Sequence, residues 1–136
     1  MNIATVNLAA SILSGIKLNK INDKRVKATL LKDYLALRKV AKEADEDKNE
    51  IIKKFQDDWH DELSEVEAFR RENKPVEGHK EYLDAERDAN KAISDILAGE
   101  ADVKLTPIAL DAVTSLSDDI TLEQVAFLQE IGLIEE

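Results

Sequence analysis

The strongest pattern in the sequence is a stripe of apolar residues that recur three or four positions apart through its first half. This spacing is typical of one face of an amphipathic helix. No glycine or proline occurs between Asn22 and Lys74, so the pattern predicts one long helix over residues 22–72, with Asn22 or Asp23 as its N-cap. We expect any break at the polar run 56–58. The stripe consists of Val26, Leu30, Tyr34, Leu37, Ala41, Ala44, Ile51, Phe55, Trp59, Leu63 and Val66.

A second helix, over residues 79–98, is predicted to fold back against the first. Pro75 and Gly78 mark the turn before it, and Gly99 follows its last residue. At 1.5 Å per residue this helix is about 30 Å long, so it covers the long helix only from roughly Ile51 onward. Residues 22–98 therefore form a long helical hairpin. Its expected contacts join Phe55 and Trp59 to Tyr82, Ala89 and Ile93.

Two short segments outside the hairpin have the pattern of strands. Residues 2–6 and residues 102–105 are both short, and an isolated strand of this length is unstable, so we expect the two to pair. Asn7 is the predicted N-cap of a short helix, which ends at Gly15 in the left-handed conformation.

The C-terminal segment has clearer helix signals. Pro107 is predicted to open a short helix through Val113. Thr121 and Gln124 have the spacing of a capping box, and Gly132 marks the end of the helix that they start. The predicted fold is thus mainly α, a long helical hairpin with short terminal helices and a small two-stranded pairing. We expect a single domain over residues 1–136, made of segments 1–21, 22–98 and 99–136.

The composition excludes several classes of protein. The chain of 136 residues has no cysteine and two histidines, so a disulfide framework, a thiol nucleophile and an ordinary structural zinc site are ruled out. Aromatic residues make up only 4%, which favours a helical domain over a β-sandwich or barrel.

The charge is divided along the chain. Residues 1–42 carry a net charge of +7, whereas the whole chain carries −10, so residues 43–136 carry −17. An acidic exterior disfavours binding to nucleic acids and to anionic membranes. The longest apolar region, residues 3–16, is too short to span a membrane and has no basic residue before it, so we expect a cytoplasmic protein.

No motif predicts a metal, cofactor or catalytic site. Asp45-x-Asp47-x-Asn49 matches the start of a calcium-binding loop, but Glu50 replaces the required glycine, so we expect an exposed helical turn. His60 and His79 stand near acids and are expected to be solvated surface groups. No nucleophile, base and orienting group can be assembled, so we expect no enzyme. The second half of the long helix carries several acids, which form either a charged face or a partner surface. They are Asp57, Asp58, Asp61, Glu62, Glu65 and Glu67.

The first half of the long helix is the candidate partner-binding region. The return helix is too short to cover its apolar strip, and exposed apolar patches usually mark interfaces. Basic residues flank the strip, so we expect self-association with the acidic tail of a neighbouring copy, or membership of a larger assembly. The alternative is that the chain's own tail covers the strip and leaves a monomer. The candidate residues are Lys24, Arg25, Val26, Leu30, Lys32, Tyr34, Leu37, Arg38 and Lys39.

The order of the predicted elements carries a resemblance. A strand-like start, a short helix, a basic entry after Leu18, one long helix and a return helix followed by Asp102-Val103-Lys104-Leu105 resemble a family of small acidic helical proteins encoded near virion genes of tailed bacteriophages and prophages. The resemblance implies a non-enzymatic structural or assembly role through protein–protein interaction, in the host cytoplasm or in the virion. The alternative is an acidic inhibitor that imitates nucleic acid and blocks a host nuclease or defence complex.

Overall fold

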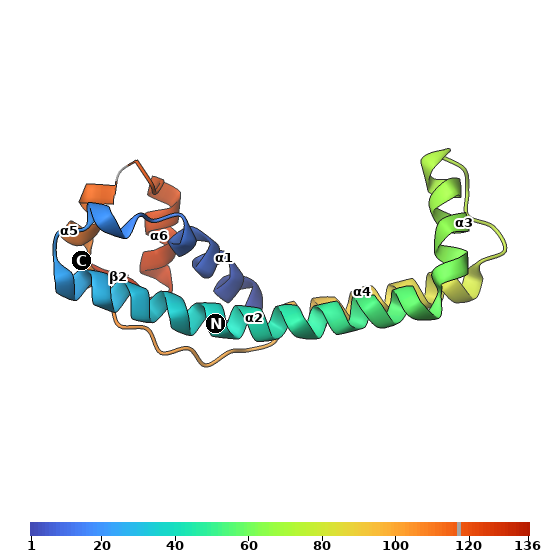
Figure 1. Cartoon of the computed structure of the whole chain (residues 1–136), viewed down its shortest axis with the longest axis horizontal. Coiled ribbons are helices and arrows are strands. Elements are labelled where there is room, and N and C mark those ends of the chain that lie inside the picture. The colour runs from blue at the N-terminus through green and yellow to red at the C-terminus, as the bar shows by residue number, and fades with distance from the viewer. Residues whose placement is uncertain (117) are drawn as a thin grey trace. The chain divides into compact units, whose positions relative to one another are not determined.

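The computed structural model describes residues 1–116 and 118–136, with Ser115 described by its backbone alone. In these residues the chain is 72% helical, with six α-helices and a small two-stranded parallel sheet, which confirms the predicted mainly α class (Figure 1). It divides into two compact units, which we call the terminal unit (Met1–Glu43 with Gly99–Glu136) and the hairpin unit (Ala44–Ala98). The long helix α2 (Lys24–Asp58) contributes residues to both.

The first residues form a helix and not the predicted strand. Helix α1 spans Ile3–Ser14, and Asn2 is its N-cap, with the side-chain oxygen accepting a hydrogen bond from the Thr5 backbone N–H at 2.8 Å. As a helix, this segment buries Val6 and Ala9 on one face, whereas a strand would point successive side chains to opposite faces. The core therefore selects the helix.

Two further details of α1 differ from the sequence prediction. Asn7, the predicted N-cap, lies inside the helix, because capping already occurs at Asn2. Gly15 does end the helix, but its φ of −83° is right-handed and not left-handed. A short 3₁₀ turn, Leu18–Lys20, then leads to α2, where the Asp23 side chain accepts hydrogen bonds from the backbone N–H groups of residues 25 and 26. Asp23 is therefore the N-cap, one of the two residues predicted for this role.

The predicted pairing of residues 2–6 with residues 102–105 is also wrong. One antiparallel bridge joins Asn2 to Glu100, and Ala101 N–H donates to the Met1 carbonyl at 2.9 Å. Residues 101–107 form a connection outside any helix or strand. Residues 3–6 form the first turn of α1, so their carbonyl groups are used within the helix, and the Ile3 N–H donates to the Gly99 carbonyl, which precedes this connection, at 2.9 Å.

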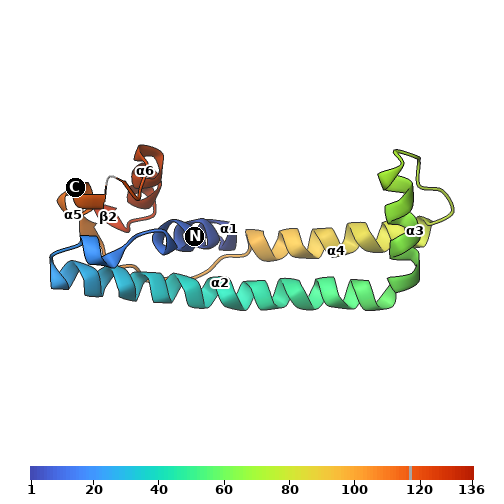
Figure 2. The same ribbon diagram turned by 45° about the horizontal axis from the view of Figure 1, so that its top comes forward.

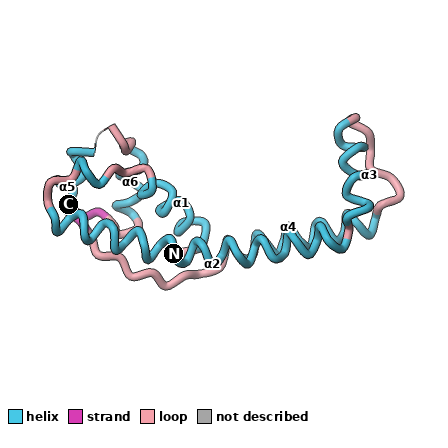
Figure 3. The backbone as a smooth tube through the Cα atoms, viewed as in Figure 1, coloured by secondary structure: helices cyan, strands magenta, loops and turns pink. Residues whose placement is uncertain are grey.

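The small sheet lies further along the tail. Strand β1 (Ile108–Ala109) pairs in parallel with β2 (Ile134–Glu135), with Ile108 opposite Ile134 (Figure 3). Pro107 therefore precedes a strand instead of opening a helix, and the short helix α5 starts later, over Leu110–Val113. Ile108 and Ile134 are both buried, so the two strands contribute to the core. A 3₁₀ turn, Thr114–Leu116, follows α5.

The last helix, α6 (Leu122–Glu130), confirms its sequence signals. Thr121 and Gln124 exchange the two hydrogen bonds of a capping box. Gly132 has a φ of 84°, the left-handed conformation that favours glycine after a helix.

The core of the terminal unit gathers residues from both ends of the chain onto the first part of α2. Helix α1 lies beside α2 in both ribbon views (Figures 1 and 2). The buried hydrophobic residues of this core are Val6, Ala9, Ile12, Leu13, Ile21, Leu30, Leu37, Ile108, Val113, Leu116, Ile120, Leu128, Leu133 and Ile134.

The hairpin unit consists of the end of α2 with α3 (His60–Arg71) and α4 (Lys80–Ala98). The predicted single helix over residues 22–72 is interrupted at Trp59, which has non-helical dihedrals of φ −123° and ψ 23°. The interruption directly follows the polar run 56–58, where we expected any break to fall. Helix α4 runs back beside the second half of α2 (Figure 2), which confirms the predicted hairpin.

Aromatic packing and one ion pair hold the hairpin unit. Tyr82 is completely buried, and its ring centroid lies 5.3 Å from that of Phe55 and 6.0 Å from that of Trp59, as the sequence predicted. The Arg70 guanidinium donates two hydrogen bonds to the Glu86 carboxylate, at 2.9 and 2.6 Å. This bidentate pair ties α3 to α4.

Candidate interaction surface

One face of α2 in the terminal unit has hydrophobic residues that the core does not cover. Lys24, Ala28, Leu31, Leu35, Arg38 and Lys42 recur four and three positions apart, so they lie on one side of the helix, and all are exposed. We call these six residues the outer face of α2. Leu31 and Leu35 stand one turn apart at its centre, and they are 44% and 50% exposed.

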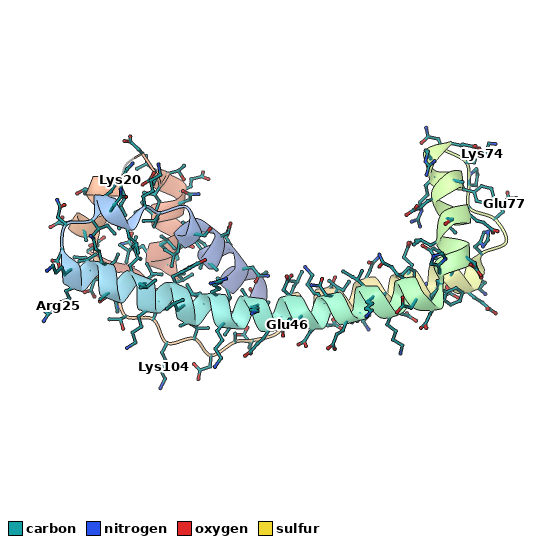
Figure 4. All side chains as sticks on the ribbon, in the orientation of Figure 1. Lys20, Arg25, Glu46, Lys74, Glu77 and Lys104 are labelled. Atoms are coloured by element: carbon teal, nitrogen blue, oxygen red, sulfur yellow. The ribbon has the colours of Figure 1, made fainter. Side chains whose placement is uncertain are left out.

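Positive charge surrounds these two leucines. Lys24 and Arg38 belong to the outer face itself, and Lys32 and Lys39 are exposed next to it. Arg25 points away from the start of the helix (Figure 4). In the described part of the chain, none of these five cations forms an ion pair with an acid. The outer face is therefore an apolar centre inside a basic surround, which attracts an acidic partner.

A small apolar pocket adjoins the outer face. It has a volume of about 150 Å³. A cavity of similar size in another protein accepts a benzene molecule, so this pocket has room for one apolar side chain. Apart from Ser14, its lining is hydrophobic or aromatic: Leu13, Ile16, Leu18, Leu30, Leu31 and Tyr34.

The structure separates the candidate residues predicted from the sequence into two groups. Leu30 and Leu37 are 3% and 0% exposed, and Val26 and Tyr34 are partly buried against the same core. The chain's own terminal segments cover most of this strip, which was the alternative expectation. Leu30 and Tyr34 contribute to the candidate surface through the lining of the small pocket. The charged candidates are all exposed: Lys24, Arg25, Lys32, Arg38 and Lys39.

Sequence reasoning missed the two leucines of the outer face. Leu31 and Leu35 fall outside the apolar stripe and among basic residues, so the helical period placed them on the solvated side. The one available signal was that two leucines stand four residues apart on that side, where polar residues are usual.

A charge pair between the basic segment and the acidic tail also occurs, as the sequence suggested. The Lys20 ammonium lies 3.4 Å from the Asp119 carboxylate, which is largely buried. This pair joins the 3₁₀ turn before α2 to the segment before α6. It is formed within one chain.

Asp33 is a buried charged residue of the terminal unit. It is 1% exposed, and its Oδ1 accepts a hydrogen bond from the Thr106 backbone N–H at 2.9 Å, which attaches the 101–107 connection to α2. Its Oδ2 is buried without a hydrogen-bond partner. Burial raises the pKa of this carboxyl, although the Thr106 hydrogen bond and the nearby Lys32 charge act in the opposite direction.

The calcium-like motif lies on a helix. Residues 45–49 belong to α2, where Asp45 and Asp47 are exposed, and the nearest cation to Asp45 is Lys48 at 3.8 Å. This confirms the prediction of an exposed helical turn. Among the described residues, no three histidine or acidic side chains are placed to hold a metal ion.

The two histidines differ. His60 is exposed, as predicted, whereas the side chain of His79 is only 14% exposed, which corrects the expectation of a solvated group. Its Nδ1 lies 3.0 Å from Glu62 and its Nε2 lies 3.4 Å from Glu65. The turn after α3 returns the chain onto the face where these two glutamates stand three residues apart. His79 therefore fastens the turn to α3.

A hollow of about 210 Å³ lies at the bend between α2 and α3. Of its six lining residues four are acids: Asp57, Asp58, Asp61 and Glu62, together with Trp59 and His60. The hairpin unit as a whole has 17 acids against nine lysines and arginines. This bend is thus an acidic concave surface of that unit.

Comparisons with protein-family models, with characterised proteins and with solved structures find no match to this chain. Within the described residues, no helix combines the length and the apolar character that crossing a bilayer requires.

Proposed function

We propose that this protein acts by binding another protein chain through the outer face of α2, without catalysis, as a structural or assembly component. The observation that carries the proposal is the pair of half-exposed leucines, Leu31 and Leu35, set one turn apart in a basic surround beside an apolar pocket. The resemblance to proteins encoded near phage virion genes supports assembly as the context.

Contiguity distinguishes this surface from ordinary exposed apolar residues. Single exposed leucines are common on protein surfaces and need no explanation. Here, however, Leu31 both stands beside Leu35 and lines the pocket, so the three features form one patch. Its burial by a partner is favourable by roughly 25 cal/mol per Å² of apolar surface removed from water. The surrounding cations add selectivity for an acidic partner and speed its association.

Site-specific photo-cross-linking tests the proposal. A photoreactive amino acid at Leu35 is expected to give a discrete protein adduct in cells that express the protein in its native setting. The matched control is Leu8 on α1, which is 51% exposed, close to the 50% of Leu35, and lines neither the pocket nor the outer face. Identical adduct patterns from the two positions, or no adduct from Leu35, would contradict the proposed function.

The acidic bend of the hairpin unit favours a second candidate function. Carboxylates gathered around a hollow offer a basic protein surface the same charge as phosphates do, which is the basis of nucleic-acid mimicry. In this case the triple variant Asp57→Asn, Asp58→Asn, Asp61→Asn should lose inhibition of a nuclease from the same source. The variants Leu31→Gln and Leu35→Gln should retain it.

A further inference from the structure

We propose that the partner of the outer face is a second copy of this chain, whose Leu122 inserts into the apolar pocket beside Leu31. This inference rests on the proposed function and names the occupant of the same surface. Both contributing surfaces belong to the terminal unit, one on each copy.

Leu122 is the most exposed large hydrophobic residue in the described chain, at 89%. It is the first residue of α6, directly after the Thr121 cap. The capping box already satisfies the start of this helix, and acidic residues or proline suit its first turn better than leucine. The described residues leave its side chain largely uncovered, and it lines the edge of an apolar groove, so Leu122 belongs to a contiguous apolar patch and is not an isolated exposed leucine.

The surroundings of Leu122 are shaped to receive a second apolar group. A groove of about 470 Å³ lies between α5 and the start of α6. When Leu122 of one copy enters the pocket of another, Leu31 and Leu35 of the second copy stand beside this groove. The two apolar surfaces can then fill each other. The groove is lined by Leu110, Val113, Thr114, Ile120, Thr121, Leu122 and Val125.

Charge selects this pairing over the alternatives. No lysine, arginine or histidine occurs after Lys104, and the elements around the groove carry Asp111, Asp118 and Glu123, all exposed. The outer face of α2 presents only cations around its leucines. Two outer faces docked on each other would bring like charges together, and so would two grooves. A contact of groove with outer face is the arrangement in which opposite charges meet.

The contact joins two different patches, and every copy has both. Such a contact either closes into a symmetric oligomer, with a reciprocal dimer as the smallest, or continues into a longer assembly. The apolar area of the pocket and the groove is small compared with standard interfaces, so we expect weak association that dilution reverses.

Sedimentation equilibrium of the full chain across the micromolar range tests the inference. The wild type should associate and should dissociate partly as salt is raised, because screening weakens the charge pairing. Leu122→Gln and the double variant Leu31→Gln, Leu35→Gln should each weaken association at least about tenfold, the effect of losing one buried leucine contact. Leu8→Gln is the matched control and should associate like the wild type. Circular dichroism and melting curves should show all variants folded, since every substituted leucine is exposed.

A mixing experiment adds a readout that general destabilisation cannot give. The Leu122→Gln variant keeps its pocket, and the Leu31→Gln, Leu35→Gln variant keeps Leu122. An equimolar mixture should therefore form a one-to-one heterodimer at concentrations where each variant alone is monomeric. In the cross-linking experiment, the adduct from Leu35 should then have twice the 15.2 kDa mass of the chain.

Two results would overturn the second-copy inference. In the first, the wild type is monomeric at every concentration and salt level; a Leu35 adduct with a different protein would then leave the proposed function intact. In the second, the wild type associates but Leu122→Gln associates equally well. If the leucines of the outer face are also irrelevant and Leu35 gives no adduct, both proposals fail.

Discussion

The terminal unit and the hairpin unit are stabilised in different ways. The terminal unit buries fourteen hydrophobic residues in one core, whereas Ala44, Val66 and Tyr82 are the buried hydrophobic residues of the hairpin unit among those described. The terminal unit has 12 acids and ten lysines and arginines, and the hairpin unit has 17 acids and nine. Apolar burial thus dominates in the first unit. The second relies on an aromatic cluster and polar pairs around it.

Because of this difference, we expect the two units to differ in local stability. A large apolar core resists local opening, while a unit that depends on a few buried side chains opens at lower free energy. The outer face of α2 and Leu122 both belong to the terminal unit, so the proposed interface lies on the more rigid part. A rigid platform loses less conformational entropy when a partner binds.

Truncating Tyr82 is expected to have the largest effect on this contrast. Tyr82→Ala removes the one buried aromatic side chain of the hairpin unit and its contacts with Phe55 and Trp59. The loss should be about 3–5 kcal/mol, as for other buried aromatic truncations. Hydrogen exchange should accelerate in residues 44–98 and much less elsewhere.

Tyr82→Phe is the control for that experiment. It keeps the ring and removes only a hydroxyl that lies 3.4 Å from Glu86, a long hydrogen bond, so its cost should be under about 1 kcal/mol. Equal acceleration of exchange in both units after Tyr82→Ala would show that they unfold together. The two units would then not differ in local stability.

Truncating Leu37 tests how much the core stabilises the terminal unit. Leu37 is completely buried in the core of the terminal unit, and Leu37→Ala should cost about 2–5 kcal/mol. Leu35→Ala, two residues away on the half-exposed outer face, should cost less than about 1 kcal/mol in the isolated subunit. Chemical denaturation of both variants measures the difference. Similar costs would mean that Leu35 is covered, and would remove the basis of the proposed surface.

The sequence predicted those parts of the fold that depend on local signals. The hairpin follows from a helical period, and the capping box of α6 follows from two nearby residues. The polar run at 56–58 marked where a break would fall, but the sequence predicted one helix over residues 22–72 and not the interruption at Trp59. The N-terminal strand and its pairing were wrong, because five residues carry too little periodicity. Burial of Val6 and Ala9 decided the conformation there, and burial is a tertiary property.

The candidate site was predictable only in part. The basic surround of α2 was evident from composition, and its cations are exposed as expected. Which leucines remain uncovered depends on where α1 and the tail lie, and no pattern in the chain reports that. The same holds for His79, since its position between Glu62 and Glu65 requires the turn after α3 to bring residues 14 to 17 positions apart together.

Variants of two asparagines near the N-terminus test where helix α1 begins. Asn2→Ala removes the cap of α1 and should cost about 1 kcal/mol. Asn7→Ala changes the residue that the sequence favoured as the cap, but this position lies inside the helix, where alanine has the higher propensity. Its effect should be neutral or slightly stabilising. Thermal melts of the two variants distinguish a helix that begins at Ile3 from the predicted strand over residues 2–6. If Asn7 were the N-cap, Asn7→Ala would be the less stable of the two variants.

The smallest expected effect is a pH dependence that has opposite signs in the two units. Burial raises the pKa of Asp33 above its ordinary value of 3.8, so the folded terminal unit binds its proton more tightly than the unfolded chain does. The Arg70 hydrogen bonds lower the pKa of Glu86 below its ordinary value of 4.5, so the folded hairpin unit binds that proton less tightly.

These two shifts lead to opposite linkage. Stability rises with pH where the unfolded state holds more protons, and falls with pH where the folded state does. As the pH is lowered from neutral, the wild type should gain stability relative to Asp33→Asn once the raised pKa of Asp33 is reached. It should lose stability relative to Glu86→Gln from about pH 4.5 downward, by no more than about 1 kcal/mol, because that pair is partly exposed.

Denaturant titrations of the three proteins across this range measure both differences. Each variant replaces a carboxyl by an amide of the same shape, so the remaining acids cancel in the comparison. If both stability differences changed in the same direction as the pH falls, one of the two carboxyls would not have the surroundings described. The stability of each variant near neutral pH would identify which one.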